Sequence, residues 1–359
     1  MHAPRFWWRH SFLSRLLAFL LWPIEAIVGR ITLQRMKNPG QSVPVPVICI
    51  GNPTVGGAGK TPTAIACIAH LEHRGAHPFT LSRGHGGSAR APLLVEPSKH
   101  GPELVGDEAL LLARHGPTII SGSSNRHAAA QVAQAQGATH IIMDDGFQNP
   151  SLVKDVSILV VDSVVGVGNN HVLPSGPLRA PLVPQLEQAD AVLLIGIKGM
   201  EMGGPGYRVE QLAQQHGCTV LHGHLEADPA TVTALQDMKL HAFAGIGRPE
   251  KFFSTLRRVG LNVALTRAFP DHHTFSPEEV EVMVQNAARQ RALLVTTEKD
   301  MARLSTQKFR LLRQRIACLP VHLVLDDPAQ LDALLETATQ RAAVRTVASA
   351  TIPPSPTSA

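Results

Sequence analysis

The 359-residue chain is long enough to form two domains with hydrophobic cores of their own. Its 44% hydrophobic and 17% charged residues exclude a chain that is disordered throughout, and four cysteines without metal-type spacing argue against a disulfide framework or a zinc site. The net charge of +5 suits anionic partners such as nucleotides or a phospholipid surface, but it is too weak and dispersed to indicate a nucleic-acid partner.

Residues 1–35 differ from the rest of the chain, and we expect them to associate with a membrane surface. Tryptophan and arginine gather here: Trp7, Trp8, Arg9, Arg15, Trp22 and Arg30. The longest uninterrupted apolar run, Leu16–Trp22, has seven residues, far fewer than the roughly 20 that span a bilayer. The pattern favours an amphipathic helix lying in the membrane interface. A helix packed against the protein is the alternative.

A glycine-rich loop follows between a predicted strand and a predicted helix. The apolar run Val47–Ile50 leads into the loop, and helical spacing begins at Lys60. The loop N–H groups and the helix N-terminus would hold phosphate oxygens, Lys60 would reach the transferring phosphate, and Thr61 would ligate magnesium. Thr54 replaces the first glycine of the strict pattern. The predicted ATP-binding residues are Thr54, Val55, Gly56, Gly57, Ala58, Gly59, Lys60 and Thr61. A simple glycine-rich turn is the alternative.

Residues 36–185 alternate short apolar runs with helical patterns, which predicts a P-loop NTPase-like, doubly wound α/β domain with a mostly parallel sheet. The predicted strands are 47–50, 78–81, 118–120, 140–143 and 156–161, and the predicted helices are near 61–74, 107–115 and 124–136. In such a sheet the ligand-binding residues follow the strands.

Polar residues stand at several of these strand ends or helix starts. Arg83 follows the strand 78–81 and is either a phosphate ligand or a solvated turn residue. Asp107 and Glu108 open a helix, where acids also serve as ordinary dipole-complementing caps. Asp144 and Asp145 close the strand 140–143, the place where P-loop enzymes carry the carboxylate that holds magnesium.

A loop rich in Gly and Pro, 166–181, precedes a second, smaller α/β domain predicted over 186–342. Its predicted strands are 191–195, 220–222, 241–244, 262–268, 293–296 and 321–325, and its predicted helices are near 249–258, 276–290, 299–315 and 328–341. Asp271, His272 and His273 precede one of these helices as an acid/base candidate or a solvated loop. Residues 343–359 lose periodicity and are predicted to be a disordered tail.

Seven motifs in this order resemble the tetraacyldisaccharide 4′-kinases of lipid A biosynthesis, and the resemblance runs from the N-terminus to about residue 325. The motifs are Gly-Asn-Pro-Thr-Val-Gly-Gly-Ala-Gly-Lys-Thr-Pro at 51–62, Leu-Ser-Arg-Gly at 81–84, Gly-Asp-Glu-Ala at 106–109, Asp-Asp-Gly-Phe-Gln at 144–148, Leu-Pro-Ser-Gly-Pro-Leu-Arg at 173–179, Phe-Pro-Asp-His-His at 269–273 and Thr-Thr-Glu-Lys-Asp at 296–300. The variant P-loop is a trait of that family.

The resemblance implies an enzyme that uses ATP and Mg²⁺ to phosphorylate the 4′-hydroxyl of an acylated glucosamine disaccharide 1-phosphate. It also implies a peripheral or monotopic protein at the cytoplasmic face of a Gram-negative inner membrane, with no known protein partner. Asp107 and His272 match the family's catalytic dyad, and Lys60 assists catalysis. The implied magnesium-side residues are Thr61, Glu108, Asp144 and Asp145, and the implied substrate residues are Arg83, Gln148, Asn149 and Arg179.

Two positions depart from the family pattern. Asn149 replaces a histidine and cannot carry its charge, and Ala180 replaces an acid. Two other functions remain as alternatives. A P-loop ATPase of the partitioning type would carry a further lysine where Thr54 and Val55 stand, and a nucleotide-binding membrane scaffold would not need Asp107 or His272.

Overall fold

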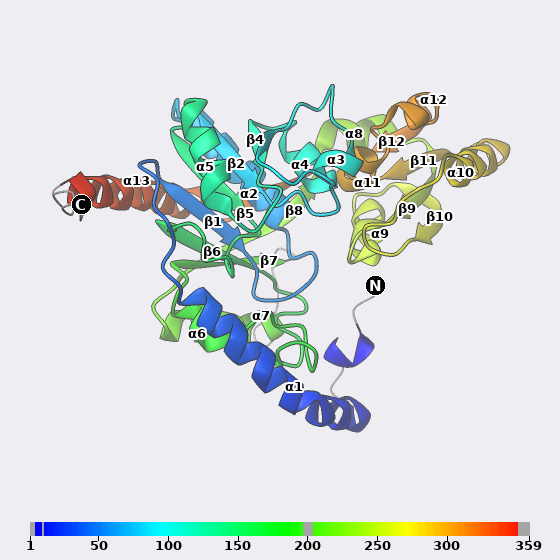
Figure 1. The fold of residues 1–359 in the computed structure, drawn as a ribbon. Coiled ribbons are helices and arrows are strands. Elements are labelled where there is room, and N and C mark those ends of the chain that lie inside the picture. Colours follow the sequence, from blue (N-terminus) through cyan, green and yellow to red (C-terminus); the bar gives the residue numbers. More distant parts are fainter. Residues whose placement is uncertain (1–3, 9–10, 197–203, 351–359) are drawn as a thin grey trace.

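The computed structural model describes residues 4–8, 11–196 and 204–350, with strands and helices alternating along most of the chain (Figure 1). The strands are β1 (Val47–Gly51), β2 (Pro78–Ser82), β3 (Leu93–Leu94), β4 (Thr118–Ile120), β5 (His140–Asp144), β6 (Val156–Asp162), β7 (Ala191–Gly196), β8 (Thr219–Ala227), β9 (Lys239–Ala244), β10 (Asn262–Ala268), β11 (Leu293–Thr296), β12 (Ile316–Cys318) and β13 (Val321–Leu325). The helices are η1 (Arg5–Trp8), α1 (Phe12–Met36), α2 (Lys60–His73), α3 (Pro102–Val105), α4 (Asp107–Leu112), α5 (Arg126–Ala135), α6 (Leu182–Leu186), α7 (Pro205–Gln215), α8 (Pro229–Leu235), α9 (Pro249–Arg258), α10 (Pro277–Arg289), α11 (Glu298–Arg303), η2 (Gln307–Phe309), α12 (Arg310–Arg313) and α13 (Pro328–Ala350).

The larger sheet has nine strands in the order β13-β8-β7-β6-β1-β5-β2-β4-β3. The seven strands from β8 to β4 are parallel, and antiparallel β13 and β3 close the two edges. β1 therefore lies between β5 and β6, so the loops that follow these three strands meet at one end of the sheet. The predicted doubly wound, mostly parallel α/β fold is confirmed.

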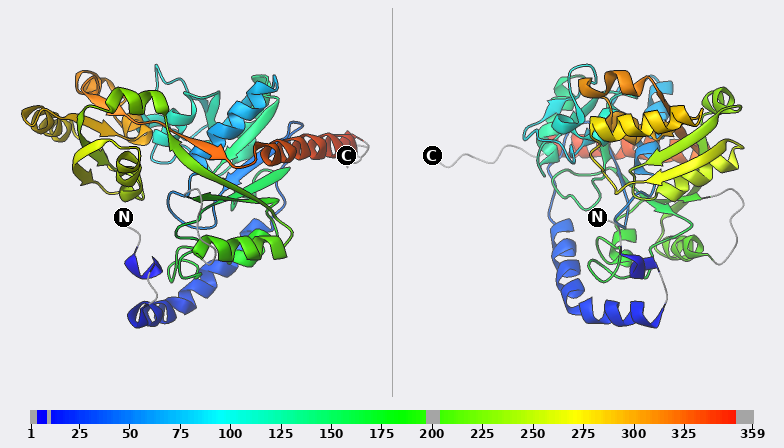
Figure 2. Two further views of the ribbon diagram at one scale, coloured as in Figure 1. Left: turned by 180° about the vertical axis from the view of Figure 1, so that it is seen from behind. Right: turned by 90° about the vertical axis from the view of Figure 1, so that its right-hand side faces the viewer.

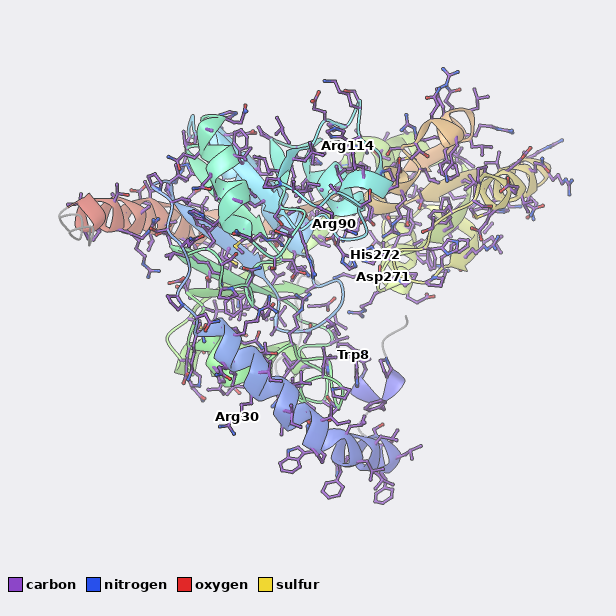
Figure 3. All side chains as sticks on the ribbon, viewed as in Figure 1. Trp8, Arg30, Arg90, Arg114, Asp271 and His272 are labelled. Carbon is purple, nitrogen blue, oxygen red and sulfur yellow. The ribbon has the colours of Figure 1, made fainter. Side chains whose placement is uncertain are left out.

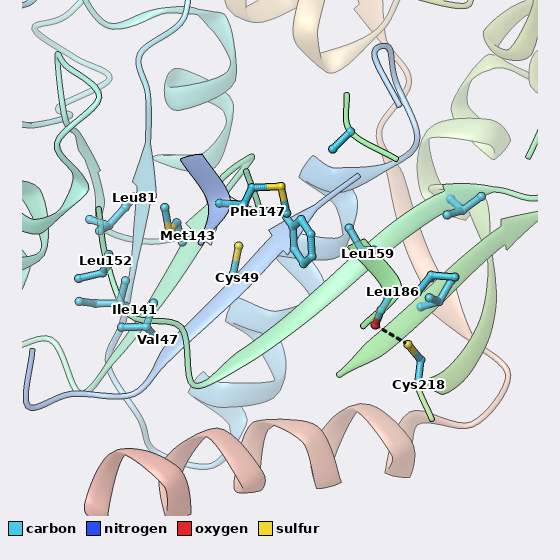
Figure 4. Packing of buried hydrophobic residues seen from close by; sticks show 14 of the residues in the cluster. Val47, Cys49, Leu81, Ile141, Met143, Phe147, Leu152, Leu159, Leu186 and Cys218 are labelled. Carbon is cyan, nitrogen blue, oxygen red and sulfur yellow. Dashed lines mark hydrogen bonds between the residues drawn. The ribbon is translucent and has the colours of Figure 1, made fainter. Parts of the chain in front are cut away.

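Side chains of β1 alternate between two hydrophobic layers, as the period of two in a strand requires. Val47 and Cys49 pack into one layer with α5, α6 and α7, and Ile48 and Ile50 pack into the other with α2 and α13. Figure 4 shows the first layer around Cys49, Met143 and Phe147. Both faces of β1 are buried, which accounts for its uninterrupted apolar sequence.

A second sheet of four parallel strands, β10-β9-β11-β12, forms a separate layer beside the first (Figures 1 and 2). It spans residues 239–318 only, because β7, β8 and β13 join the first sheet. The predicted division at residue 186 is thus not where the sheets divide: the smaller domain is inserted between β8 and β13. Strands alternate with helices in the same way on both sides of residue 186. This alternation therefore gives no information about which sheet a strand joins.

The N-terminal helix α1 is 25 residues long and bends along its length, with Pro23 inside it (Figure 2). Its apolar stretch has a mean hydropathy of 1.8 and is 11% buried, so by length and composition it could cross a membrane. The prediction from the run Leu16–Trp22 alone understated this, because further apolar residues lie beyond Arg15 on one side and beyond Pro23 and Glu25 on the other. Trp7 is also not free for lipid: it is buried, and its indole N–H donates to the Pro174 carbonyl. Arg9 lies outside the described residues.

Two further helix predictions were wrong in extent. The helix predicted over 299–315 is three short pieces: α11 ends at Arg303, and after residues 304–306 the 3-10 turn η2 leads directly into α12. The C-terminal helix α13 continues to Ala350, so 343–350 is helical where a disordered tail was predicted. Arg345 explains part of this extension, since it forms an ion pair with buried Asp155 at 2.8 Å. Residues 351–359 of the predicted tail lie outside the described part of the chain.

Candidate active site

The glycine loop lies between β1 and α2, as the sequence predicted. Gly56 and Gly59 have φ angles of 109° and 107°, which L side chains rarely adopt. A Cβ at Gly59 would also lie 2.5 Å from Ile195 Cδ1. Lys60 begins α2, and its ammonium donates to Asn52 Oδ1 at 3.2 Å and lies 3.6 Å from Asp145 Oδ1. The glycines thus leave the loop backbone uncovered by side chains, and the ammonium of Lys60 is held beside it.

Asp145, at the end of β5, links the glycine loop to the 166–181 loop. Arg179 makes a two-pronged ion pair with it, at 2.8 and 3.2 Å, and also donates to the Thr54 carbonyl at 3.1 Å. Burial alone would raise the pKa of Asp145, but the charges of Lys60 and Arg179 lower it to about 2. Arg179, expected at the substrate, therefore braces the P-loop in this structure.

Asp144 is buried and, unlike its neighbour Asp145, has a carboxylate oxygen that accepts no hydrogen bond from the described residues. Within the described part of the chain, its Oδ1 atom has no hydrogen-bond partner. Burial, together with the nearby carboxylates of Glu108 and Asp145, raises the pKa of Asp144 to about 7. A buried carboxylate oxygen without a partner is costly unless a cation or donor completes it.

Glu108 is the next acid in this cluster and is held by the second sheet. Lys299, which belongs to the Thr-Thr-Glu-Lys-Asp motif, contacts Glu108 Oε1 through its ammonium at 2.6 Å. The charge of Lys299 lowers the pKa of Glu108, and Glu108 in turn raises the pKa of Lys299 against the effect of burial. An ion pair between α4 and α11 thereby joins the two domains near Asp144.

Asp107 and His272, predicted as a dyad from opposite halves of the chain, are in contact. His272 Nδ1 lies 3.3 Å from Asp107 Oδ2, at the side of the second sheet that faces the first (Figure 3). Burial would raise the pKa of Asp107, but the hydrogen bond with His272 and the charge of Arg303 hold it well below its usual range. The same hydrogen bond raises the pKa of His272. Asp107 is therefore ionised at neutral pH.

Arg303 is the member of this site that the sequence did not predict. Its Nε donates to Asp107 Oδ2 at 2.7 Å, and its Nη1 donates to Asp300 Oδ1 at 2.6 Å and to the Gly245 carbonyl at 2.5 Å. Its side chain is 8% exposed. No signal in the sequence singled it out, because it lies 196 positions from Asp107 and gains its meaning only from the packing of the two sheets.

A second arginine that the sequence did not predict, Arg126, begins α5 and is almost fully buried. It donates to Ser121 Oγ, and within the described residues its Nε atom has no partner. Burial lowers its pKa to about 10, against the charges of Asp144 and Asp145. The arginine therefore places a buried positive charge behind the acidic pair.

The remaining predicted substrate residues are arranged less closely. Gln148 donates to the Asn52 carbonyl at 3.1 Å, which fixes the start of the P-loop. Asn149 donates to the Ser124 carbonyl at 2.8 Å and accepts from Ser151, so the departure at this position serves the local loop. Arg83 is exposed on the loop after β2. Substrate contacts for these residues stay predictions.

A cleft of about 300 Å³ lies on one side of the dyad. It is lined by His85, Gly86, Pro102, Glu103, Gly106, Asp107, His272, His273, Thr274, Phe275, Arg303, Thr306, Lys308 and Phe309. The lining comes from loops and short helices of both domains, so the cleft lies where the two domains meet.

Removing Arg303 leaves two buried carboxylates without their cation. We expect Arg303→Ala to lower the free energy of unfolding by about 3 kcal/mol near neutral pH. Because the folded-state pKa of Asp107 lies well below the unfolded-state pKa of about 4, this stabilisation is present above pH 4 and is lost progressively as the pH falls from there through the folded-state pKa. Urea titrations at pH 7 and pH 2 measure it, because at pH 2 most of this stabilisation is already lost. Arg257→Ala, which removes an exposed arginine, is the control. The account would be contradicted if Arg303→Ala lost equal stability at both pH values, or lost no more stability than Arg257→Ala.

The site combines a strand–glycine loop–helix carrying a lysine, a carboxylate pair at the end of the neighbouring strand, and an acid of the larger domain paired with a histidine of the inserted domain. Together these features define a P-loop phosphotransferase. Within that class, the chain belongs to the tetraacyldisaccharide-1-P 4′-kinase family, whose profile matches residues 17–340.

Individual relatives agree with the family match. The tetraacyldisaccharide 4′-kinases of Xanthobacter autotrophicus and Azorhizobium caulinodans are 57% and 50% identical to the chain, and each alignment covers at least 95% of this chain and 98% of the relative. An LpxK crystal structure from Aquifex aeolicus, in complex with ATP, matches with a TM-score of 0.67 at 24% identity. That alignment covers 90% of this chain and 99% of the other, and it shows that the fold is shared.

Proposed function

We propose that the chain transfers the γ-phosphate of ATP to the 4′-hydroxyl of an acylated glucosamine disaccharide 1-phosphate, with Asp107 as the base. As a member of its family the chain is a kinase that uses ATP with magnesium. The observation that supports this assignment of residues best is the contact between Asp107 and His272 across the two domains. A protein that only binds nucleotide has no use for an ionised, buried acid held in this way.

Asp107 would accept the proton of the attacking hydroxyl, and His272 would orient the carboxylate or tune its pKa. The Asp107 Oδ1 atom already accepts from the Glu108 N–H at 2.9 Å, while Oδ2 meets His272 and Arg303. The carboxylate is thus fixed in one orientation before substrate binds. Because phosphoryl transfer has a loose transition state, we expect this proton transfer to contribute less than positioning and charge neutralisation.

The residues at the end of β5 fit a magnesium ion. Asp144 offers a buried oxygen that lacks a partner, Thr61 is buried in the first turn of α2, and Glu108 lies close enough to influence Asp144 electrostatically. In residues 4–8, 11–196 and 204–350, no three His, Cys, Asp or Glu side chains form a complete metal cage. Protein-bound magnesium commonly takes one or two carboxylates and completes its shell with phosphate and water. The bound ion would neutralise phosphate charge.

Lys60 would supply the fixed positive charge for the transferring phosphoryl group. Asn52 and Asp145 hold its ammonium over the loop, and Arg179 shares Asp145, so this oxygen cluster is not left with excess negative charge. The predicted roles of Asp145 as magnesium support and of Arg179 as substrate ligand are therefore secondary to a role in holding the loop.

The direct test uses the purified full chain, ATP, magnesium and the acylated disaccharide 1-phosphate in detergent. We expect release of ADP to depend on the acylated acceptor, and the same disaccharide without acyl chains serves as the matched control. ADP release at the same rate without acceptor would favour a P-loop ATPase, and nucleotide binding without turnover would favour a scaffold. Either result would overturn the proposal.

We further propose that α1 holds the enzyme on the cytoplasmic face of the inner membrane, where its lipid acceptor lies. Ser14, Ala18 and Gly29 face the protein. The exposed side is apolar: Phe12, Leu13, Leu16, Leu17, Phe19, Leu20, Trp22, Ile24, Ile27 and Ile31. This arrangement, with the bend at mid-helix, supports a helix that enters one leaflet from the side.

Replacing Phe12, Phe19 and Leu20 together by serine should release the protein from anionic liposomes. Their side chains are 83%, 73% and 63% exposed, and burying such a side chain contributes about 1.5–3 kcal/mol each. Liposome sedimentation measures the release, and binding of ATP should not change. The matched control replaces three exposed apolar residues on other helices, Val282, Leu311 and Val344, by serine. Equal sedimentation of the two variants would mean that the membrane contact lies elsewhere.

A further inference from the structure

A second contact between the two domains lies on the other side of the P-loop from the dyad, and it centres on Asp162. This residue ends β6, the strand beside β1, and its side chain is 5% exposed. Its Oδ2 atom receives the Arg248 guanidinium at 2.7 Å and the Lys251 ammonium at 3.0 Å. Its Oδ1 atom accepts from the Val164 N–H at 3.1 Å, which fixes the carboxylate.

Both cations belong to the smaller domain. Arg248 is the N-cap residue of α9 and Lys251 lies in its first turn, directly after the loop 245–248 that follows β9. Gly247, in that loop, lies against the P-loop: a Cβ built on it would be 3.4 Å from the Gly57 backbone nitrogen. The loop therefore contacts the glycines expected to hold the nucleotide phosphates, and the Asp162 ion pairs anchor it there.

The other end of the same loop reaches the dyad. The Gly245 carbonyl accepts from Arg303 and from the His272 N–H at 3.1 Å, and its N–H donates to Asp300 Oδ2 at 3.1 Å. A loop of four residues thus connects Asp162 at one end with the groups that hold Asp107 at the other. Rigid connections this short transmit small displacements, because packed interiors deform little.

We propose that Asp162 is a positioning residue for the transfer reaction: its ion pairs with Arg248 and Lys251 hold the loop 245–248 on the P-loop and so fix the distance from the dyad to the nucleotide phosphates. This inference rests on the function proposed above. The phosphoryl donor and the acceptor hydroxyl bind to different domains, so their alignment depends on the contacts that join the domains. Asp162 is the contact on the nucleotide side.

The test compares the full-length wild type with Asp162→Asn, which keeps the shape of the side chain and its bond to Val164 but removes the charge. We expect kcat to fall about tenfold or more, the KM for the acceptor to stay within about twofold, and Asp162→Glu to restore part of the rate. Arg257→Gln, which removes an exposed cation from the last turn of the same helix, is the matched control and should not change kcat.

Hydrogen exchange measured by mass spectrometry gives a readout that needs no activity. In Asp162→Asn the peptide over 240–253 should exchange faster than in wild type, while α5 stays unchanged. Unchanged exchange and unchanged kcat in Asp162→Asn, with an active wild type, would overturn the positioning role and leave the kinase intact. If the wild type transfers no phosphate, the function proposed above fails, and the exchange result alone decides whether Asp162 holds the loop. If Asp162→Asn does not fold, the double variant Arg248→Gln/Lys251→Gln is judged by the same outcomes.

Discussion

Replacing Lys60 with alanine should lower kcat by on the order of 10²-fold or more. The Lys60 ammonium lies beside the glycine loop, 3.2 Å from Asn52 Oδ1 and 3.6 Å from Asp145 Oδ1. Helix α2 contains no other lysine that could replace it. Without it the negative charge that develops on the transferring phosphoryl group loses a neutralising partner. Turnover is measured as phosphate transferred from ATP to the acylated acceptor under saturating conditions.

The control for Lys60→Ala is Lys99→Ala, which removes the same charge from an exposed pair with Glu96. This control should retain full turnover, since exposed ion pairs contribute little. Near-normal kcat in Lys60→Ala would remove the assignment of the glycine loop as the phosphate site, whatever the fold.

Replacing Asp107 and His272, singly and together, should show that they act as a unit. Each alanine variant should lose most of the base-assisted rate, and the double variant should be hardly slower than the worse single variant. The 3.3 Å contact and the mutual pKa shifts provide the physical reason, because either residue alone loses its partner. The measurement is kcat for all four proteins at one pH.

One contact in the site and one control measurement make this cycle interpretable. Arg303 still holds Asp107 in place when His272 is removed, so His272→Ala leaves the acid in position. Melting curves identify any variant that loses activity through unfolding. Losses in log kcat that add fully would show independent action, and the dyad would have to be abandoned.

The sequence predicted this site well where chemistry and chain geometry coincide. Lys60 and Asp107 each begin a predicted helix, and Asp144 follows a predicted strand, all within the domain of the larger parallel sheet. The carboxyl ends of the strands in such a sheet meet at one edge. His272 could be paired with Asp107 only through the family resemblance, because the two residues lie on different sheets.

What the sequence could not predict depends on pairing between distant segments. The short apolar runs that predict β7, β8 and β13 as strands look the same in either sheet, so the sequence did not show that these three strands join the larger sheet. Arg303 and Lys299 look like ordinary basic residues of a helix until the fold brings buried carboxylates to them. The sequence also did not show which side of α1 faces the protein. In the structure this side carries small residues of the helix, and only the packing against distant segments identifies it.

The measurement that tests the central claim most directly is the position of the new phosphate on the acceptor. Product made by the full-length enzyme from ATP and the acylated disaccharide 1-phosphate can be examined by ¹H–³¹P correlation NMR. The account predicts two phosphorus signals, one correlated with the proton at carbon 1 and a new one correlated with the proton at carbon 4′, and it predicts that Asp107→Ala forms the second far more slowly. A new phosphate on any other carbon, or inorganic phosphate as the only product, would contradict it.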